Sequence, residues 1–278
     1  MKTRICLLYD HIKSCRYFGV MVSVFLFTIA GCNSKKSTPE KQKVDLQENQ
    51  NNAESAQINT LTKEEKKEGW RLLFDGKTTE GWRGAYKEGF PEKGWRVEDG
   101  LLKTVSSGGG ESESGGDILT EDQFSSFEIS LEFKLTKGAN SGIKYFVKET
   151  YPEPEGSAIG LEYQLIDDNR PDVEGTWTLA SLYELYKAKN KNVNPIGEFN
   201  KARILVEGKH VEHWLNGLKV LEYIRGSEDF QKRVSKSKYK DYENFGEVGQ
   251  GHILLQEHGS EVAFKNIKIR EIDPSASE

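Results

Sequence analysis

The nine residues from Phe127 to Leu135 alternate without a break between apolar and polar side chains. A strand sends successive side chains to opposite faces of a sheet, so this stretch has one apolar face and one polar face. The pattern predicts a strand that covers a core on one side and faces outward on the other. A chain built around such a strand needs further strands to complete the core.

Short apolar runs separated by turn signals recur along the chain. Asp99-Gly100 lies between two such runs, which favours a type I′ turn, and Asn216-Gly217 marks another turn. Helical signals are few: Thr62 and Glu65 form a capping-box signature, which predicts one short helix ending near Gly69. We therefore expect an all-β fold, a monomeric antiparallel β-sandwich or jelly roll with a short N-terminal helix.

Several segments lack strand patterning. Residues 106–116 are rich in Gly, Ser and Glu and are expected to form a mobile loop. Residues 148–158 and 168–198 are expected to form two longer loops. Residues 226–248 are polar, with clusters of Lys, Tyr and Asp, and are expected to form a helix or a lid.

The first 32 residues have the pattern of an export signal. Basic residues precede an apolar run over residues 17–30, which is short for a spanning helix. The run ends in Ile29-Ala30-Gly31-Cys32, which resembles the bacterial lipobox, so residues 1–32 are expected to be a lipoprotein signal peptide acylated at Cys32. Asn33 favours the outer membrane of a Gram-negative bacterium over the inner one. A plain signal anchor, or a cysteine that is there by chance, stays open as the alternative.

Residues 33–60 are almost free of large apolar side chains, so we expect a disordered polar tether there and a single β domain over residues 61–272. Cys6, Cys15 and Cys32 all precede this domain, which excludes a disulfide or a thiolate metal site within it. The formal net charge of -5 argues against nucleic-acid binding.

Polar side chains on the predicted strands form the candidate site. Glu162 and Gln164 share the face opposite the apolar residues of their strand, and Gln256 and His258 share one face of another strand. A carboxylate, amides and an imidazole on neighbouring strands would make a polar floor suited to a hydroxyl-rich ligand such as a sugar. The alternative for each residue, ordinary strand surface, stays open.

The other candidates, which only the fold could bring together, are Glu132, Lys144, Asp167, His213 and Trp177. His213 shares its parity with Val211 and Leu215, so a core position stays open for it. Trp177 lies in a long loop, where it would stack on a sugar ring or join a satellite hydrophobic cluster. Standard zinc, phosphate-loop and serine-hydrolase motifs are absent from the sequence, so the metal ligands, if any, are unknown.

Ten stretches of the chain, taken together and in order, resemble the 3-keto-disaccharide hydrolase family. They are residues 69–77, 81–82, 115–120, 127–134, 140–143, 162–167, 197–200, 212–217, 255–259 and 264–267. They span the whole predicted β domain. The one departure noted is Phe199, where the family usually has Trp. The family's fold is a concanavalin A-like jelly roll, in agreement with the strand pattern.

The resemblance implies an enzyme, a hydrolase of 3-keto-disaccharides or 3-keto-glycosides. A ketone at C3 acidifies the C2 proton, so a base can form an enolate that expels the aglycone from C1, and water can then add to the enone. This chemistry needs a base and an enolate stabiliser rather than the paired carboxylates of ordinary glycosidases. It also admits one cofactor, a divalent cation that chelates O2 and O3.

The implied catalytic candidates are Glu162, His213 and His258, and the sequence does not decide which is the base. The implied substrate-binding candidates are Glu132, Lys144, Gln164, Asp167, Gln256 and Trp177. The implied partners are a 3-keto-sugar or another carbohydrate, and a membrane through the lipid anchor. Two other functions stay open: a non-catalytic carbohydrate-binding domain, because fold does not fix function, and a structural lipoprotein domain.

Overall fold

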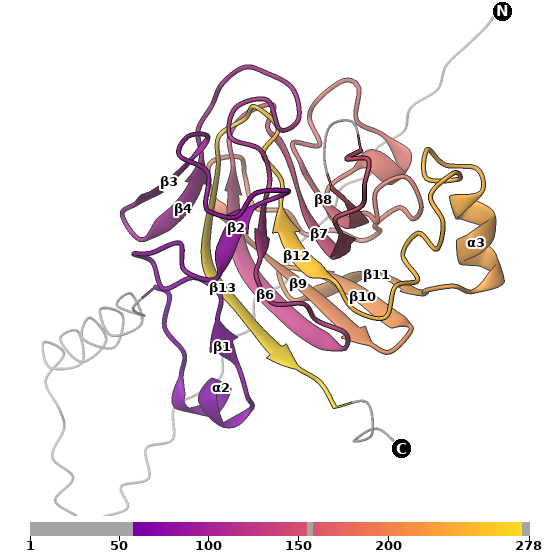
Figure 1. The fold of residues 1–278 in the computed structure, drawn as a ribbon, viewed down its shortest axis with the longest axis horizontal. Helices are drawn as coiled ribbons and strands as arrows, with labels where there is room; N and C mark the ends of the chain where they lie inside the picture. The colour runs from indigo at the N-terminus through magenta and orange to yellow at the C-terminus, as the bar shows by residue number, and fades with distance from the viewer. Residues whose placement is uncertain (1–57, 155–157, 274–278) are drawn as a thin grey trace, which may run out of the picture. The chain divides into compact units, whose positions relative to one another are not determined.

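The strands of the chain pair into two antiparallel sheets (Figure 1). In the computed structural model the described residues are 58–154 and 158–273. The predicted signal peptide with Cys32, and residues 33–57 of the predicted 33–60 tether, lie outside these residues. At the end of that tether the prediction is wrong, because Asn59 is buried and donates to Asn266 Oδ1 and to the carbonyl oxygen of Gly100.

The larger sheet has eight strands in the order β11-β10-β9-β6-β13-β4-β3, and β1 pairs with β13 off this path. Their bounds are β1 Arg71–Leu72, β3 Trp95–Glu98, β4 Leu101–Thr104, β6 Phe127–Leu135, β9 Phe199–Glu207, β10 His210–Leu215, β11 Leu218–Ile224 and β13 Val262–Glu271. Strand β6 is the alternating stretch of the sequence, with the predicted bounds. It lies between β9 and β13, so most of its backbone groups are paired on both sides.

The smaller sheet has five strands in the order β2-β5-β12-β7-β8. Their bounds are β2 Trp82–Gly84, β5 Ile118–Thr120, β7 Asn140–Lys148, β8 Ile159–Ile166 and β12 His252–Leu255. The pairings within both sheets are antiparallel.

The core lies between the two sheets. Phe127 and Ile129 of β6 and Tyr145 and Leu161 of the smaller sheet are buried in one apolar cluster. The rings of Phe127 and Tyr145 meet edge to face across the two sheets, with centroids 6.4 Å apart. The predicted all-β antiparallel sandwich is therefore confirmed.

Local signals in the sequence set the turns and the first helix. Asp99 and Gly100 have φ of 53° and 73°, the two positive values that a type I′ turn requires, and they join β3 to β4. Asn216-Gly217 joins β10 to β11 in the same way. The Thr62–Glu65 capping box begins helix α2, Lys63–Lys67. Each of these predictions is confirmed.

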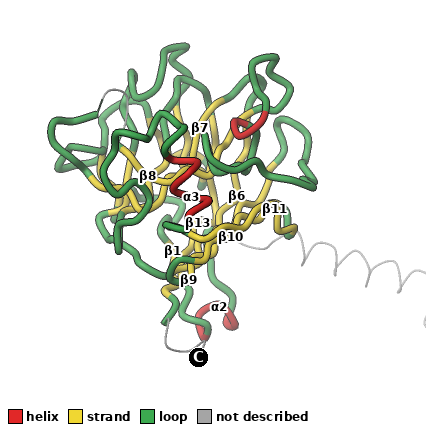
Figure 2. Tube along the Cα trace, turned by 90° about the vertical axis from the view of Figure 1, so that its right-hand side faces the viewer, coloured by secondary structure: helices red, strands yellow, loops and turns green. Residues whose placement is uncertain are grey.

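The remaining helices are short and lie in the predicted loops. Helix α3, Glu228–Val234, falls in the segment predicted to hold a helix or a lid, and a single 3₁₀ turn, Gly175–Trp177, falls in the 168–198 loop. In Figure 2 the helices are short red segments among yellow strands and green loops. Within the part of the chain that the structure describes, no helix is both long and apolar enough to cross a membrane.

Candidate active site on the outer face of the smaller sheet

Strand alternation and register gather polar residues on the face of the smaller sheet that points away from the core. Leu161, Tyr163 and Leu165 of β8 lie in the core, so Glu162 and Gln164, which alternate with them, face outward. Register pairs Lys144 of β7 with Glu162. It also pairs Gly142 with Gln164. The backbone N–H of Gln256 donates to the carbonyl oxygen of Gly142 at 3.0 Å. We call this set the polar floor.

Lys144 is the cation of the polar floor. Its buried Nζ lies 3.1 Å from Glu111 Oε1 and 3.8 Å from Asp117 Oδ2. It also donates to the carbonyl oxygen of Ala158 at 3.4 Å. Burial lowers the pKa of the Lys144 ammonium, but the charges of Asp117, Glu162 and Glu111 outweigh burial and hold this pKa above its ordinary value. Lys144 therefore stays protonated at neutral pH.

Glu162 is a buried carboxyl, 5% exposed, on the strand next to Lys144. Burial raises the pKa of Glu162 to about 7, against the opposing charge of Lys144. With its nitrogen turned toward acceptors, the Gln164 amide donates to Glu162 Oε1 and to the carbonyl oxygen of Ser141, both at 3.0 Å. A carboxyl with this pKa exchanges its proton near neutral pH, which is what a general base requires.

Gly142 leaves the space that the Glu162 carboxyl occupies. A Cβ atom on residue 142 would lie 2.5 Å from Glu162 Oε1, closer than non-bonded atoms approach. Any side chain at this position would therefore displace the carboxyl or the strand. This is a physical reason for glycine within residues 140–143, one of the stretches that carry the family resemblance.

The loop over residues 106–116 forms one wall of the site and carries Glu111. Backbone N–H groups of this loop donate to Glu257: Ser112 N to the carbonyl oxygen at 2.8 Å, and Ser114 N to Oε2 at 3.1 Å. The amide of Gln256 also donates to Glu111 Oε1 at 2.6 Å. These bonds hold Glu111 over the polar floor.

Residues 238–245, which we call the cover segment, close the site from another side. Lys238 Nζ lies 4.6 Å from the ring centre of Tyr183 and 5.2 Å from that of Tyr239. The ring of Tyr239 stacks on Phe245 with centroids 4.0 Å apart. The cavity between the cover segment, Glu111, Lys144 and residues 158–160 is about 40 Å³. Small-molecule sites typically measure about 300–1,000 Å³, so this cavity is too small to hold a whole sugar as it stands.

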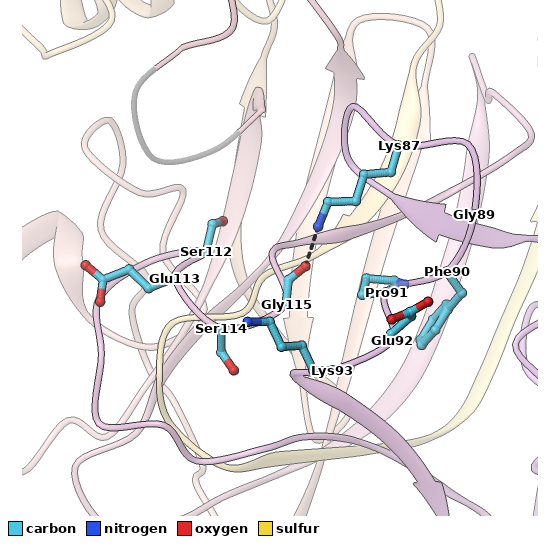
Figure 3. Close-up of a pocket in the computed structure, with 10 residues that line it drawn as sticks. All are labelled: Lys87, Gly89, Phe90, Pro91, Glu92, Lys93, Ser112, Glu113, Ser114 and Gly115. Atoms are coloured by element: carbon cyan, nitrogen blue, oxygen red, sulfur yellow. Dashed lines mark hydrogen bonds between the residues drawn. The ribbon is translucent and has the colours of Figure 1, made fainter.

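A larger hollow of about 680 Å³ lies on the other side of the 106–116 loop (Figure 3). It is lined by Lys87, residues 89–93 and residues 112–115. Figure 3 shows the Lys87 side chain reaching across to the carbonyl oxygen of Gly115, to which Nζ donates at 2.8 Å. Ser112 Oγ donates to Asp117 Oδ1 at 3.1 Å, so a residue that lines this hollow contacts a carboxylate that also lies beside Lys144.

The structure does not bring His213 to the polar floor. Its ring lies in the core, where Nδ1 donates to the carbonyl oxygen of Ala180 at 2.9 Å and Nε2 accepts from the Tyr145 hydroxyl at 2.8 Å. The ring also packs on Tyr163, which faces the opposite side of β8 from Glu162. Burial lowers the pKa of His213 to about 4, so the ring is neutral. His213 thus occupies the core position that its parity left open.

Two more predicted residues lie away from the floor. Glu132 is on the larger sheet, where it accepts from Asn266 Nδ2 at 2.6 Å and lies 3.3 Å from Lys265 Nζ. Asp167 follows the end of β8 and accepts from the backbone N–H groups of Gly138 and residue 169, at 2.8 and 3.0 Å. Both carboxylates are already bound to groups of the protein that hold local structure.

His258 and Trp177 lie at the edges of the site. Burial raises the pKa of Glu111, but the charge and hydrogen bond of Lys144, the Gln256 hydrogen bond and the charge of His258 lower it below its ordinary value. His258 is therefore close enough to Glu111 to act on its charge. Trp177 is 44% exposed and stacks on Tyr183 with ring centroids 6.3 Å apart, at the outer edge of the cover.

Sequence reasoning missed Glu111, Asp117 and Tyr239. Glu111 lies in the loop predicted to be mobile, and Tyr239 lies in a polar segment without strand patterning, so neither has a local signal. Asp117 does have one, because it precedes β5 within the 115–120 stretch that carries the family resemblance.

Two places in the described residues gather groups that could ligate a metal ion. Among the described residues, His210, Glu212 and Glu222 have ligand atoms within 4.8 Å of one another. Lys219 Nζ lies 2.9 Å from Glu212 Oε1 and also contacts Glu222, so a cation already neutralises these carboxylates. On the polar floor the Lys144 ammonium takes the corresponding place between Glu111 and Asp117. Neither arrangement fits a divalent cation as it stands, and the predicted cation stays a prediction.

Known proteins resemble this chain over most of its length. A 3-keto-disaccharide hydrolase of Bacteroides thetaiotaomicron is 34% identical, and the alignment covers 93% of this chain and 97% of that protein. A crystal structure of a candidate glycosyl hydrolase from Parabacteroides distasonis is 36% identical, with a TM-score of 0.70, and the match covers 78% of this chain and all of that one. A second candidate glycosyl hydrolase from the same species is 27% identical with a TM-score of 0.54, covering 73% and 99% of the two chains.

The family model for a 3-keto-α-glucoside-1,2-lyase-like domain matches residues 69–270, which include both sheets and the polar floor. The matched residues agree with the span of the resemblance read from the sequence. The predicted family is confirmed: this chain belongs to the 3-keto-disaccharide hydrolase family.

Proposed function

We propose that this chain is a glycoside-cleaving hydrolase of 3-keto-sugars, and that it works by C2 proton abstraction, elimination of the aglycone and hydration. The observation that carries the mechanism is Glu162, a buried carboxyl with a pKa of about 7 beside the protonated Lys144. The name of the Bacteroides relative supports the substrate class.

In the first step the Glu162 carboxylate takes the C2 proton. This proton is acidic because the electron pair left on C2 delocalises onto the C3 ketone oxygen. A base whose pKa lies near the working pH serves this step best, since it is ionised often enough and still basic enough. Among the sequence candidates for the base, Glu162 has the support of both position and pKa.

Lys144 stabilises the enolate oxygen that forms at C3. A fixed ammonium in a site closed to bulk water stabilises developing negative charge without reorganisation. Glu111 and Asp117 hold Lys144 in place through their contacts with Nζ. The enolate then expels the aglycone as the C1–O bond breaks, and the leaving oxygen takes a proton, for which His258 beside Glu111 is our candidate donor.

In the last step water adds to C1 of the enone, the proton that the water releases restores the donor His258, and the proton held by Glu162 returns to C2. The balance is one water consumed, one free aglycone and one 3-keto-sugar formed. Glu162 ends in its starting ionisation state, so the cycle can repeat.

We also propose that the protein works at the cell envelope, held by a lipid on Cys32. The lipobox-like Ile29-Ala30-Gly31-Cys32 supports this. A Cys32→Ser variant should then leave the protein unprocessed or release it from the membrane fraction. Unchanged partitioning of a processed Cys32→Ser protein would refute the anchor and leave the chemistry untouched.

The test of the function is direct. The purified protein is incubated with 3-keto-trehalose or a 3-keto-glucoside, and free sugar is measured with and without EDTA. The unoxidised parent sugar is the control, and it should not be cleaved. A C2-deuterated 3-keto substrate should react more slowly where proton removal limits the rate. Cleavage of the unoxidised parent would instead indicate ordinary glycosidase chemistry, and binding without any cleavage would indicate a carbohydrate-binding domain.

A further inference from the structure

Two side-chain oxygen atoms, Gln256 Oε1 of the polar floor and Asn140 Oδ1 beside it, are buried without a hydrogen bond. Among the described residues, four buried side-chain atoms have no hydrogen-bond partner: Ser130 Oγ, Asn140 Oδ1, Arg225 Nε and Gln256 Oε1. Asn140 is the first residue of β7, and Gln256 directly follows β12; these two strands lie side by side in the smaller sheet. Both orphan oxygens are acceptors.

Register places these two acceptors around Gly142. Asn140 lies two residues before Gly142 and shares its face of β7, because side chains alternate along a strand. Gln256 is held next to Gly142 by its backbone hydrogen bond. Glu162 Oε1 fills the space above Gly142, so the two acceptors and the proposed base share one part of the floor.

The orientation of the Gln256 amide is fixed. Its nitrogen donates to Glu111 Oε1 at 2.6 Å, so turning the amide over would place its oxygen against a carboxylate. The end of the amide without a partner is therefore the oxygen. A buried acceptor without a donor is rare because it loses its hydration and gains nothing in return. Two of them beside one base indicate a ligand that brings its own donors.

We propose that Asn140 and Gln256 form a subsite that recognises two hydroxyl groups of the sugar ring whose C2 proton Glu162 removes. Their side-chain oxygens accept hydrogen bonds from these hydroxyls. The C3 ketone has no proton to donate, so the hydroxyls are those that remain on the ring and its C6 carbon. The substrate class is thus a 3-keto-sugar with free hydroxyls, and sugars alkylated at these oxygens are excluded. This proposal rests on the proposed function for the identity of the ring.

The test compares Asn140→Ala with Ser130→Ala. Ser130 is a matched control, since its Oγ is also buried without a hydrogen-bond partner but lies on β6 of the larger sheet. Each variant removes an unsatisfied acceptor, so neither should unfold at a lower temperature than wild type. Only Asn140→Ala should weaken sugar binding, with an increase of about two- to tenfold in KM, the value of one net hydrogen bond. If Asn140→Ala gives no folded protein, Asn140→Ser carries the same comparison.

A second readout does not depend on turnover. Binding of trehalose, the unoxidised probe, is measured by calorimetry for wild type, Asn140→Ala and Ser130→Ala, and Asn140→Ala alone should bind it more weakly. One deoxy analogue of the 3-keto substrate should bind wild type more weakly than the full substrate does. Asn140→Ala should bind that analogue and the full substrate equally well, because the missing hydroxyl is the one that Asn140 binds. Wild-type binding by Asn140→Ala overturns the subsite, even where hydrolysis proceeds as proposed. Weakened binding without any hydrolysis supports the subsite and rejects the proposed function instead.

Discussion

The outer face of each sheet contains a buried carboxylate, and the two carboxylates differ in their hydrogen-bond partners. On the larger sheet Glu128 is 4% exposed and accepts from the guanidinium groups of both Arg203 and Arg270, the latter through Nε at 2.7 Å. On the smaller sheet Glu162 is 5% exposed and accepts from a neutral amide, that of Gln164. Burial is equal, so the difference lies in the partners. A fully paired carboxylate holds structure, whereas an underpaired one keeps a proton available near neutral pH.

Replacing each carboxylate with an amide tests this contrast, and we expect it to give the largest change in activity. Glu162→Gln should lower kcat on a 3-keto-disaccharide by about 10²–10⁴-fold, the usual contribution of a general base. Glu128→Gln should leave kcat unchanged and lower the free energy of unfolding by about 3 kcal/mol, since it weakens a buried charge network. Steady-state kinetics and thermal unfolding measure both. Equal losses of activity in the two variants would remove the distinction between the faces.

The second largest effect is expected when the lysine on each outer face is replaced. Lys144→Met should reduce kcat by about 10²–10³-fold, because the enolate oxygen loses its charge partner. Lys265→Met, on the larger sheet beside Glu132, is the control and should retain wild-type kcat. Lys144 lowers the pKa of Glu162, so the residual activity of Lys144→Met should require a higher pH. Near-wild-type turnover by folded Lys144→Met would reject its role.

The pH dependence sharpens the contrast further. The pKa of Glu162 rises from its ordinary value of 4.5 to about 7, so kcat/KM should increase as the pH rises through 7 and Glu162 ionises. The stability of the folded protein should instead decrease as the pH rises. The folded protein binds this proton more tightly than the unfolded chain, so the free energy of unfolding falls between pH 4.5 and 7 and this loss is complete above 7. Glu162→Gln should lack that part of the slope, and an identical slope in the variant would contradict the raised pKa.

The smallest effect is expected at Glu132, a residue that the sequence offered for substrate binding. Its carboxylate pairs with Lys265 at the partly exposed surface of the larger sheet. Glu132→Gln should change the free energy of unfolding by about 1 kcal/mol or less and leave KM unchanged. An increase in KM would show that the larger sheet also contacts the sugar.

The features that could be predicted from the sequence are those set by near neighbours along the chain. The alternation in β6, the Asp99-Gly100 turn and the Thr62 capping box each depend on a few consecutive residues, and each was found as expected. Parity also gave the outward direction of Glu162 and Gln164 correctly.

Parity shows which face a side chain takes but not which sheet its strand joins. Glu132 and Glu162 satisfy the same alternation rule, yet their strands belong to different sheets. That choice depends on pairing between strands far apart in sequence, such as β7 with β12. Glu111 could not be placed either, since bonds to Gln256 and Glu257, more than a hundred residues later, fix its loop.

The narrow cavity under the cover segment bears on what finally leaves the enzyme. In the proposed mechanism, elimination yields a reactive enone, which then either escapes into solution or is captured by water. Opening before water adds would make the enzyme a lyase that releases the unsaturated sugar, and opening afterwards makes it a hydrolase. The ratio of free enone to 3-keto-sugar among the products therefore reports whether residues 238–245 open before or after water adds. A cavity of about 40 Å³ with Lys238 and Tyr239 in its wall favours retention, and so favours the hydrated product.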